Sequence, residues 1–354
     1  MNNEKIRTSK FAMMTSTALV AGSLLTGAAY AQVPNDNEKF FTGMNVNFLV
    51  GSAPGGGYGI YASVLSRHIG KHLPGKPTIV ARNMDGAGSI TAANLLYNKL
   101  PKDGSTFGAI FMGAVVEPLI GDASATLYDA RKFIYIGSAN RETSICVAWH
   151  TSGIETFEDV LTKELIIGTS GITSSIRQYP TVLNNVLGAK FKMITGYPGS
   201  REAALAMERG ETSGICGIQW TSFITSYQPW LEEKKVRIIA QISSPEGDAA
   251  LNKLGVPTIY KYVKNEADKK TLGVIFNQLE FGRPYILPPG TPPQRVEAYR
   301  NAFDATMKDP DFLAEAEKLK LGIDPVSGVN VQKIVEQIYA TPETEVVRAR
   351  AALK

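Results

Sequence analysis

The chain has 354 residues, of which 44% are apolar and 20% are charged, the composition of an ordinary soluble globular protein. Its length exceeds what one hydrophobic core usually organises, so we expect two domains or one unit of two lobes. The formal net charge is +4, and the first 31 residues contribute two of these charges. The rest of the chain therefore has no large basic excess with which to bind nucleic acid.

The N-terminus has the pattern of a secretory signal peptide. Lys5, Arg7 and Lys10 precede an uncharged, largely apolar stretch over residues 11–25, and the small-residue site Ala29-Tyr30-Ala31 follows. Threonine, serine and glycine interrupt the apolar stretch, whereas a membrane anchor needs about 20 strongly apolar residues. We therefore predict a signal peptide over residues 1–31, cleavage after Ala31 and an exported mature chain.

The two cysteines, Cys146 and Cys216, allow two interpretations. In an exported protein they can pair as a disulfide. Both also lie in short apolar runs that predict strands, and their spacing does not show that they are close in space. The sequence favours two buried thiols over a disulfide.

The first structured stretch, residues 46–65, predicts a strand, a glycine loop and a helix. The apolar run 46–50 is followed by five glycines and one proline within residues 51–59. Apolar residues then recur at positions 60, 61, 64 and 65, which is helical spacing. Glycines let a ligand approach the backbone, and the first turn of a helix leaves N–H groups unpaired. We expect this loop to bind an anion, and more narrowly a carboxylate.

Strands and helices alternate through the rest of the chain. The pattern predicts helices at 60–72, 90–100, 157–161, 174–187, 201–208, 292–307, 311–320 and 331–340, and strands at 78–81, 106–112, 165–167, 191–195 and 236–242. Residues 133–149 are long and strand-like enough to pass from one lobe to another. Ser200 is the expected N-cap of the helix that follows it. Alternation of strands with helices of ten or more residues predicts an α/β fold with mainly parallel sheets.

Four segments carry glycines directly before a predicted helix: residues 53–59, 86–89, 168–171 and 196–200. In an open α/β sheet such loops lie at the carboxyl ends of the strands, where ligands bind. If each lobe supplies two of them, they face one another across a cleft, and the free N–H groups of several helices converge there. The joint occurrence of these loops predicts a ligand site.

Other interpretations of these motifs have less support. Residues 57–62 fit the G-x-G-x-x-A pattern of dinucleotide-binding proteins, but no acidic residue follows the second strand to hold a ribose. There is no G-x-S-x-G motif, no H-E-x-x-H motif and no Walker lysine, which argues against an enzyme. His68 and His72 have a spacing that can hold zinc, yet no third ligand is close in sequence. We predict no metal and no cofactor.

An ordered series of motifs resembles the solute-binding proteins of tripartite tricarboxylate transporters, also called Bug-type receptors. Residues 53–57 resemble the first ligand loop of that family, and residues 80–83 with 86–88 resemble its second conserved loop. The matching motifs of the second lobe and of the C-terminal part are residues 168–171, 197–200, 210–211, 257–258, 287–292, 309–312 and 327–328. The resemblance covers nearly all of the mature chain.

The resemblance implies a periplasmic receptor, without enzymatic activity, that has a periplasmic-binding-protein type II-like fold of two α/β lobes. Such a receptor closes on a small organic anion, here a di- or tricarboxylate or an aromatic carboxylate, and delivers it to membrane permease subunits. We expect it to act as a monomer. The implied ligand-binding residues are Ser52, Ala53, Pro54, Gly55, Gly56, Gly57, Tyr58, Gly86, Ala87, Gly88, Thr169, Ser170, Gly171, Ser174, Tyr197, Gly199, Ser200 and Arg201.

The chain departs from the family pattern in both glycine loops of the first lobe. Relatives often have an aspartate where this chain has Gly59, and proline and glycine where it has Asp85 and Ser89. An aspartate at position 59 would suit an amine of the ligand, so its loss argues against amino-acid ligands. Arg201 and Arg177 are candidate partners for a second carboxylate, with solvated helix-surface arginines as the interpretation that the sequence favours.

We expect lobe 1 to comprise residues 40–139 and 242–354 and lobe 2 to comprise residues 140–241, with hinges near 138–142 and 240–244. Two other functions stay open at this stage. One is an exported hydrolase or lyase that uses the same cleft, and the other is a ligand-sensing subunit that reports to a signalling kinase. Turnover of a bound ligand would favour the enzyme, and neighbouring permease genes would favour the receptor.

Overall fold

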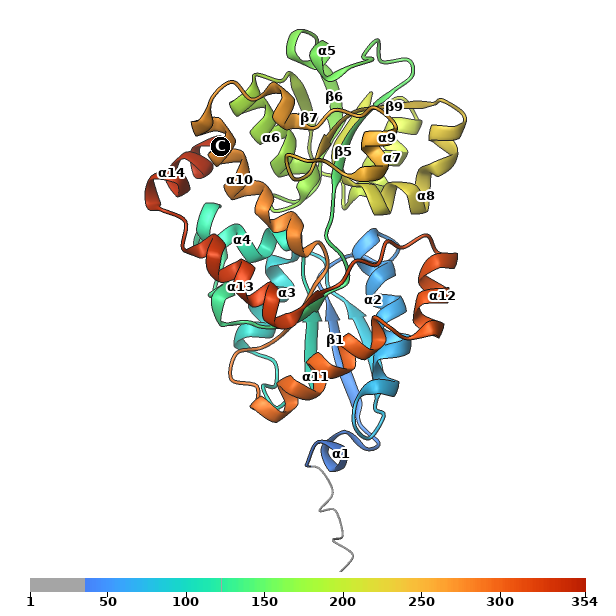
Figure 1. Ribbon diagram of the computed structural model, residues 1–354, viewed down its shortest axis with the longest axis vertical. Coiled ribbons are helices and arrows are strands. Elements are labelled where there is room, and N and C mark those ends of the chain that lie inside the picture. Colours follow the sequence, from blue (N-terminus) through green and yellow to red (C-terminus); the bar gives the residue numbers. More distant parts are fainter. Residues whose placement is uncertain (1–35, 122) are drawn as a thin grey trace, which may run out of the picture. The chain divides into compact units, whose positions relative to one another are not determined.

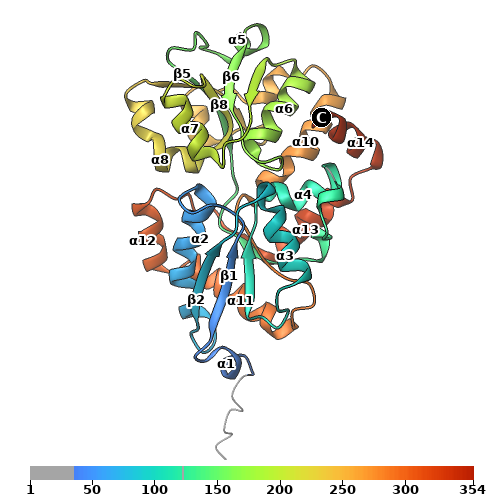
Figure 2. The same cartoon turned by 180° about the vertical axis from the view of Figure 1, so that it is seen from behind.

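The computed structural model describes residues 36–121 and 123–354. The predicted signal peptide and its cleavage site after Ala31 therefore lie outside the described residues. Within residues 36–354 the chain forms two sheets, each flanked by helices (Figures 1 and 2). No helix of the described ranges is long and apolar enough to cross a membrane. The predicted α/β fold class is confirmed.

The first sheet has six strands in the order β11-β4-β10-β3-β1-β2. β1 (Asn45–Val50) pairs in parallel with β2 (Thr78–Asn83) and β3 (Thr106–Ala109). The strands of the later chain run antiparallel to their neighbours: β4 (Ile134–Ser138), β10 (Pro284–Leu287) and β11 (Val326–Ser327). The parallel part of this sheet is thus the part built from the predicted strand–helix units.

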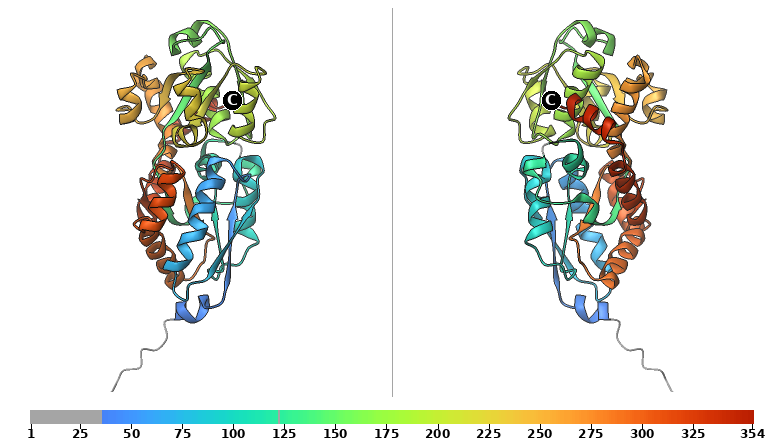
Figure 3. Two further views of the ribbon diagram at one scale, coloured as in Figure 1. Left: turned by 90° about the vertical axis from the view of Figure 1, so that its right-hand side faces the viewer. Right: turned by 90° about the vertical axis from the view of Figure 1, so that its left-hand side faces the viewer.

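Alternating apolar residues of β1 bury both faces of this sheet. Val46, Phe48 and Val50 face one core and Leu49 faces the other. The first core is covered by α2 (Gly57–His68), α11 (Pro293–Thr306) and α12 (Pro310–Lys318). The second is covered by α3 (Ile90–Asn98), α4 (Met112–Ile120) and α13 (Gly328–Tyr339). Figure 3 shows helices on both sides of the sheet, and α1 (Asp36–Phe41) precedes β1.

The second sheet has five strands in the order β7-β6-β8-β5-β9. β6 (Leu165–Gly168) pairs in parallel with β7 (Phe191–Ile194) and β8 (Gly214–Gln219). β5 (Ser144–Trp149) lies antiparallel to β8 and to β9 (Val236–Ile242). Its helices are α5 (Phe157–Thr162), α6 (Ser175–Leu187), α7 (Ser200–Glu208) and α8 (Trp220–Glu232).

Three further α-helices are α9 (Ala249–Lys253), α10 (Glu266–Phe276) and α14 (Glu343–Ala352). α14 packs against α10 and also forms hydrogen bonds with a helix from each half of the fold. Arg350 Nε donates to Leu119 O of α4, and Asn185 Nδ2 of α6 donates to Ala352 O, each at 2.9 Å. The C-terminal end of the chain is thus fastened to both halves of the fold.

The chain enters the second sheet between β4 and β5, which confirms residues 133–149 as a crossing. After β9, Thr258 forms a bridge with Gln241, and the chain rejoins the first sheet at β10. The lobe boundaries near residues 139 and 241 and the hinges near 138–142 and 240–244 stay predictions.

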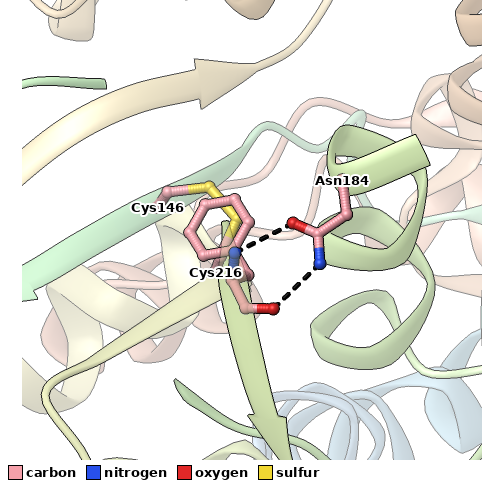
Figure 4. Close-up of a disulfide and its surroundings, with 4 residues drawn as sticks. Cys146, Asn184 and Cys216 are labelled. Carbon is pink, nitrogen blue, oxygen red and sulfur yellow. Dashed lines mark hydrogen bonds between the residues drawn. A yellow bond between two sulfur atoms is a disulfide. The ribbon is translucent and has the colours of Figure 1, made fainter. Parts of the chain in front are cut away.

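Cys146 of β5 and Cys216 of β8 form a disulfide (Figure 4). The two residues are direct partners in the antiparallel ladder, and both are fully buried. Their burial is as predicted, but the favoured interpretation of two free thiols is wrong. Strand register brings them together, and residue spacing along the sequence carries no information on that register. Beside them, the amide of Asn184 exchanges two hydrogen bonds with the backbone of Phe191.

Candidate ligand-binding site

A cavity of about 80 Å³ is enclosed by loops that follow strands of both sheets. The first sheet supplies the loops after β1 and β3, and the second supplies the loops after β6, β7 and β8. The lining residues are Ser52, Ala53, Pro54, Gly56, Gly57, Tyr58, Phe111, Met112, Gly113, Ser170, Thr173, Ser174, Ser175, Ile176, Pro198, Gly199, Ser200, Arg201, Glu202, Gln219 and Gln278. Pockets for drug-sized ligands hold roughly 300–1,000 Å³, so this cavity suits a ligand of few heavy atoms.

The loop after β1 brings bare backbone to the cavity. Gly56 is the N-cap of α2, and a Cβ added there would meet nothing within 4 Å. Its backbone is extended, with φ −81° and ψ 167°, so the position tolerates a side chain that would project into open space. At Gly57 an added Cβ would lie 2.1 Å from Ser222 Oγ. Glycine at 57 therefore allows the first turn of α2 to lie close to α8.

Gly59 does not line the cavity. A Cβ added at this position would lie 2.8 Å from the carbonyl oxygen of Ala53, so the loop folds back over the first turn of α2. A side chain at position 59 would point at this loop and not at a ligand. The sequence argument against amino-acid ligands, which relied on Gly59, therefore loses its basis.

The loops of the second sheet contribute hydroxyl groups. Ser174 is the N-cap of α6, and Ser170 Oγ donates to its Oγ at 2.7 Å. Gln219 Nε2, at the end of β8, donates to Ser175 Oγ at 2.7 Å. Ser200 was predicted as an N-cap, but Gly199 holds that place and Ser200 is the first residue of α7. The two hydrogen bonds join the loop after β6 and the start of α6 to the end of β8.

Five helices begin at this cavity: α2, α4, α6, α7 and α8. Their N-cap residues are Gly56, Phe111, Ser174, Gly199 and Gln219, and the side chain of none of these accepts a cap bond from its helix within the described chain. The first turns of α2, α4, α6 and α8 carry no acidic residue, whereas α7 carries Glu202. The partial positive charge of five helix ends therefore surrounds one small space.

Tyr58 links the cavity to the strands that join the two sheets. Its hydroxyl donates to Gly282 O at 2.7 Å and accepts from Met112 N at 3.1 Å. Burial raises its pKa, and the Arg283 guanidinium, 4.4 Å from the ring centroid, opposes that rise. Arg283 Nη2 lies 3.2 Å from the buried Glu142 carboxylate. Tyr58, which lines the cavity, thus packs against the buried ion pair of Arg283 and Glu142.

Solved structures of periplasmic binding proteins share this fold. The periplasmic binding protein BugD matches with a TM-score of 0.68 and 19% identity, over 87% of this chain and 97% of that chain. MatC from Rhodopseudomonas palustris, solved with bound malate, matches with a TM-score of 0.66 and 18% identity, over 88% and 99%. Another R. palustris protein, solved with adipate, matches with a TM-score of 0.66 and 17% identity, over 87% and 97%.

The chain has the fold of Bug-type periplasmic binding proteins. This confirms the fold that the sequence resemblance implies. No protein-family model matches the sequence, and no curated protein matches it. The Bug-type fold is therefore recognised from the structure, at identities that carry no information on the ligand.

Seven residues predicted to bind the ligand lie outside the lining of this cavity: Gly55, Gly86, Ala87, Gly88, Thr169, Gly171 and Tyr197. Thr169 is fully buried, and its N–H and hydroxyl both bond Ile194 O, so it joins β6 to β7. A Cβ added on Gly168 would lie 3.0 Å from the ring of Tyr197, so this ring packs against the end of β6. At Gly55 an added Cβ would lie 3.0 Å from Arg201 Nη1. A ligand contact from these seven residues stays a prediction.

Ten lining residues escaped the sequence analysis: Phe111, Met112, Gly113, Thr173, Ser175, Ile176, Pro198, Glu202, Gln219 and Gln278. Residues 111–113 were missed because residues 106–112 form one apolar run, whereas β3 ends at Ala109 and α4 begins at Met112. Gln219 ends a strand and had no glycine loop beside it to mark it. Gln278 lies in the short helix Asn277–Phe281, far along the chain from the other loops.

The two histidines with zinc-like spacing bond acidic side chains. His68 Nε2 lies 2.6 Å from Glu315 and His72 Nε2 lies 2.6 Å from Asp309. Arg67 and His68 lower the pKa of Glu315. Across residues 36–121 and 123–354 no group of three or more His, Cys, Asp or Glu side chains is placed to hold a metal ion.

Proposed function

We propose that this protein is a periplasmic receptor that binds a small organic carboxylate and delivers it to a membrane permease. The observation that carries the proposal is the set of five helix N-termini, from both sheets, whose N-cap residues line one small cavity without a side-chain cap. Unpaired N–H groups and the positive ends of helices favour an anion. A carboxylate fits the size of the space and the hydroxyl groups along its second wall.

Three further observations support this assignment. Proteins of the same fold were solved with malate and with adipate, both of them small carboxylates. The N-terminal sequence has the pattern of a signal peptide cleaved after Ala31, which agrees with a periplasmic location. The matching structures are binding proteins, which agrees with a receptor without catalytic activity. The permease of a tripartite tricarboxylate transporter is the partner that we propose, with the receptor acting as a monomer.

The ligand contacts that we propose come from three loops. Gly56, Gly57 and Tyr58 would bind the carboxylate from the first sheet, and Ser170, Ser174, Gly199 and Ser200 from the second. Arg201 lines the cavity and is placed to bind a second carboxylate of the ligand. Arg177 lies outside the lining, with Nη1 3.8 Å from Met193 Sδ, so we assign it no ligand contact.

A thermal-shift panel tests the proposal on the mature chain, with malate, adipate, citrate and benzoate as probes. A probe at 100 times its dissociation constant should stabilise the folded protein by about 2.7 kcal/mol. Mass spectrometry of the small molecules that survive native purification extends the panel to compounds outside it. If no carboxylate stabilises the protein, the proposal is wrong. If the bound compound is recovered chemically changed, a hydrolase or lyase becomes the better assignment.

A further inference from the structure

Thr173 makes a contact between loops of the two sheets. Its hydroxyl donates to Gly88 O at 2.6 Å and lies 3.3 Å from Ala87 O. Ala87 and Gly88 follow β2 of the first sheet, whereas Thr173 follows β6 of the second. We call Thr173, Ala87 and Gly88 the clasp. It joins the sheets at a place other than the strands through which the chain passes from one to the other.

Glycine is required at the positions that receive Thr173. Gly88 has φ +66°, and a Cβ there would lie 1.7 Å from Thr173 Oγ1. A Cβ on Gly113, at the start of α4, would lie 2.1 Å from Thr173 O. A Cβ on Gly171 would lie 3.0 Å from Gly88 N. Small residues on both sides thus let the two loops meet with backbone against backbone.

The clasp adjoins the cavity through α6. Thr173 directly precedes Ser174, the N-cap of α6, and Ser174 N bonds Gly171 O at 2.9 Å. Ala87 and Gly88 themselves do not line the cavity. Docking of Thr173 on Gly88 therefore places the start of α6 opposite the starts of α2 and α4 without adding a ligand contact from the first sheet.

We propose that the segment 86–88 is a docking seat for Thr173 that holds the cavity closed, so that Gly88 and Thr173 act as positioning residues. This rests on the proposed function, since closure around a ligand is what a receptor of this kind requires. A contact present only in the closed form raises the affinity of every ligand by the same factor, because it changes the fraction of binding-competent protein. Residues 86–88, which the sequence predicts as part of a second ligand loop, would then hold the cavity closed.

Substitution of Gly88 by alanine tests the seat, with Gly43→Ala as the matched control. Gly43 has φ +72°, close to that of Gly88, and nothing lies within 4 Å of an added Cβ. Both variants therefore carry the same backbone penalty, and only Gly88→Ala obstructs Thr173. By calorimetry with malate and adipate, Gly88→Ala should weaken both probes by one common factor of at least about 30, and Gly43→Ala by less than about 2. Equal affinities of the two variants would overturn the proposal.

Thr173 variants separate the hydroxyl from the shape of the side chain. Thr173→Val removes the donor and should weaken both probes about 5- to 15-fold, the range for one hydrogen bond that is made only in the closed form. Thr173→Ser keeps the donor and should restore binding to within about 3-fold of the parent. Because Thr173 also lines the cavity, unequal factors for malate and adipate would mean a ligand contact instead, and would contradict the positioning role.

A cross-linking experiment tests the clasp without any ligand. Cysteines replace Ala87, which takes part in the clasp through its backbone oxygen alone, and Ile172, which directly precedes Thr173. Both residues are exposed, Ile172 to 57%. A short bismaleimide should cross-link the two cysteines rapidly in the parent chain. Addition of Gly88→Ala should slow the cross-linking at least about 10-fold, and addition of Gly43→Ala should leave its rate unchanged. Failure of the parent pair to cross-link, or equal rates in both variants, would contradict the clasp. If the clasp forms but neither malate nor adipate binds, the proposed function fails for these ligands and the clasp stands.

Discussion

Helices that begin at the cavity and helices that begin elsewhere start in different ways. Away from the cavity, five helices have an N-cap side chain that accepts a hydrogen bond from the first turn: α5, α9, α10, α12 and α13, capped by Thr156, Asp248, Asn265, Asp309 and Ser327. At the cavity, α2, α4, α6, α7 and α8 have no such bond. Three helices away from the cavity also lack it: α11 and α14 each begin directly after a proline, and the N-cap Ser89 of α3 donates its hydroxyl to Gly51 O.

The difference does not follow from residue type alone. Ser174 is a serine in extended conformation at an N-cap position, which is what a capping serine requires, yet its Oγ accepts from Ser170 and from no amide of the first turn of α6. A capping side chain contributes about 1 kcal/mol to stability. The cavity helices lack this contribution, and no N-cap side chain competes there with the anionic ligand that we propose.

The largest expected effect is that of Gly56→Val. The valine side chain would project into the cavity where a Cβ now meets nothing within 4 Å, so malate and adipate binding should weaken by more than about 100-fold with the fold intact. Gly273→Val is the control, because Gly273 lies in α10 with equally open space around its Cβ position. Calorimetry measures both. An unchanged affinity of Gly56→Val would mean that this loop does not meet the ligand.

Ser174→Asp converts a cavity helix into a capped one. Its carboxylate should bond the α6 amides and repel a ligand carboxylate, so affinity falls about 10- to 50-fold while the melting temperature holds or rises. Ser327→Asp makes the same change at α13, where Ser327 already bonds Asn330 N, and should leave affinity unaltered. Calorimetry and thermal melts of both variants check this. Equal losses of affinity would remove the distinction between the two groups of helices.

Thr156→Ala tests the opposite side of the comparison. Thr156 and Asp159 form a capping box at the start of α5, which is remote from the cavity lining. Loss of the hydroxyl should lower the free energy of unfolding by about 1 kcal/mol, measured by urea denaturation. Affinity for malate and adipate should stay the same. A change in affinity would show that α5 is coupled to the cavity.

The smallest expected effect concerns acid pH. Hydrogen bonds from the backbone of Glu155, from Lys163 and from the backbone of Thr156 lower the pKa of Asp159 below its usual value of 3.8. A carboxyl with a lowered folded-state pKa stabilises the fold above its unfolded pKa, and this contribution disappears as the pH falls below about 4. Urea denaturation between pH 6 and pH 3 should therefore give a shallower loss of stability in Asp159→Asn than in the parent chain.

The strand–loop–helix units were predictable because each combines a local apolar pattern with a glycine loop. The predicted strands at 46–50 and 165–167 correspond to β1 and β6, and the helix at 174–187 corresponds to α6. α4 and α8 were missed, since each contains a proline, Pro118 and Pro229, and α4 is apolar nearly all round. Periodicity cannot distinguish such a buried helix from a strand.

The parts of the site that could not be predicted depend on partners distant in the sequence. The sequence predicts Gly86–Gly88 as a ligand loop because glycines precede a helix, and it gives no sign that Thr173, from the other sheet, bonds Gly88 O. The sequence argument about the ligand relied on Gly59, and only the path of the loop places Ala53 O 2.8 Å from a Cβ added there. At these positions a glycine in the sequence indicates a close contact, and the structure identifies the atoms that make the contact.

The disulfide makes the two halves of the molecule unequal in a reducing compartment. The loop that Cys146 and Cys216 close spans 70 residues, which include β6, β7, α6 and α7. In the chain-entropy description, closing a loop of this length stabilises the fold by about 4 kcal/mol. These are the only two cysteines of the chain, so the first sheet has no such dependence. Before oxidation, the wall of the cavity that the second sheet supplies therefore lacks this contribution, and the wall from the first sheet loses nothing.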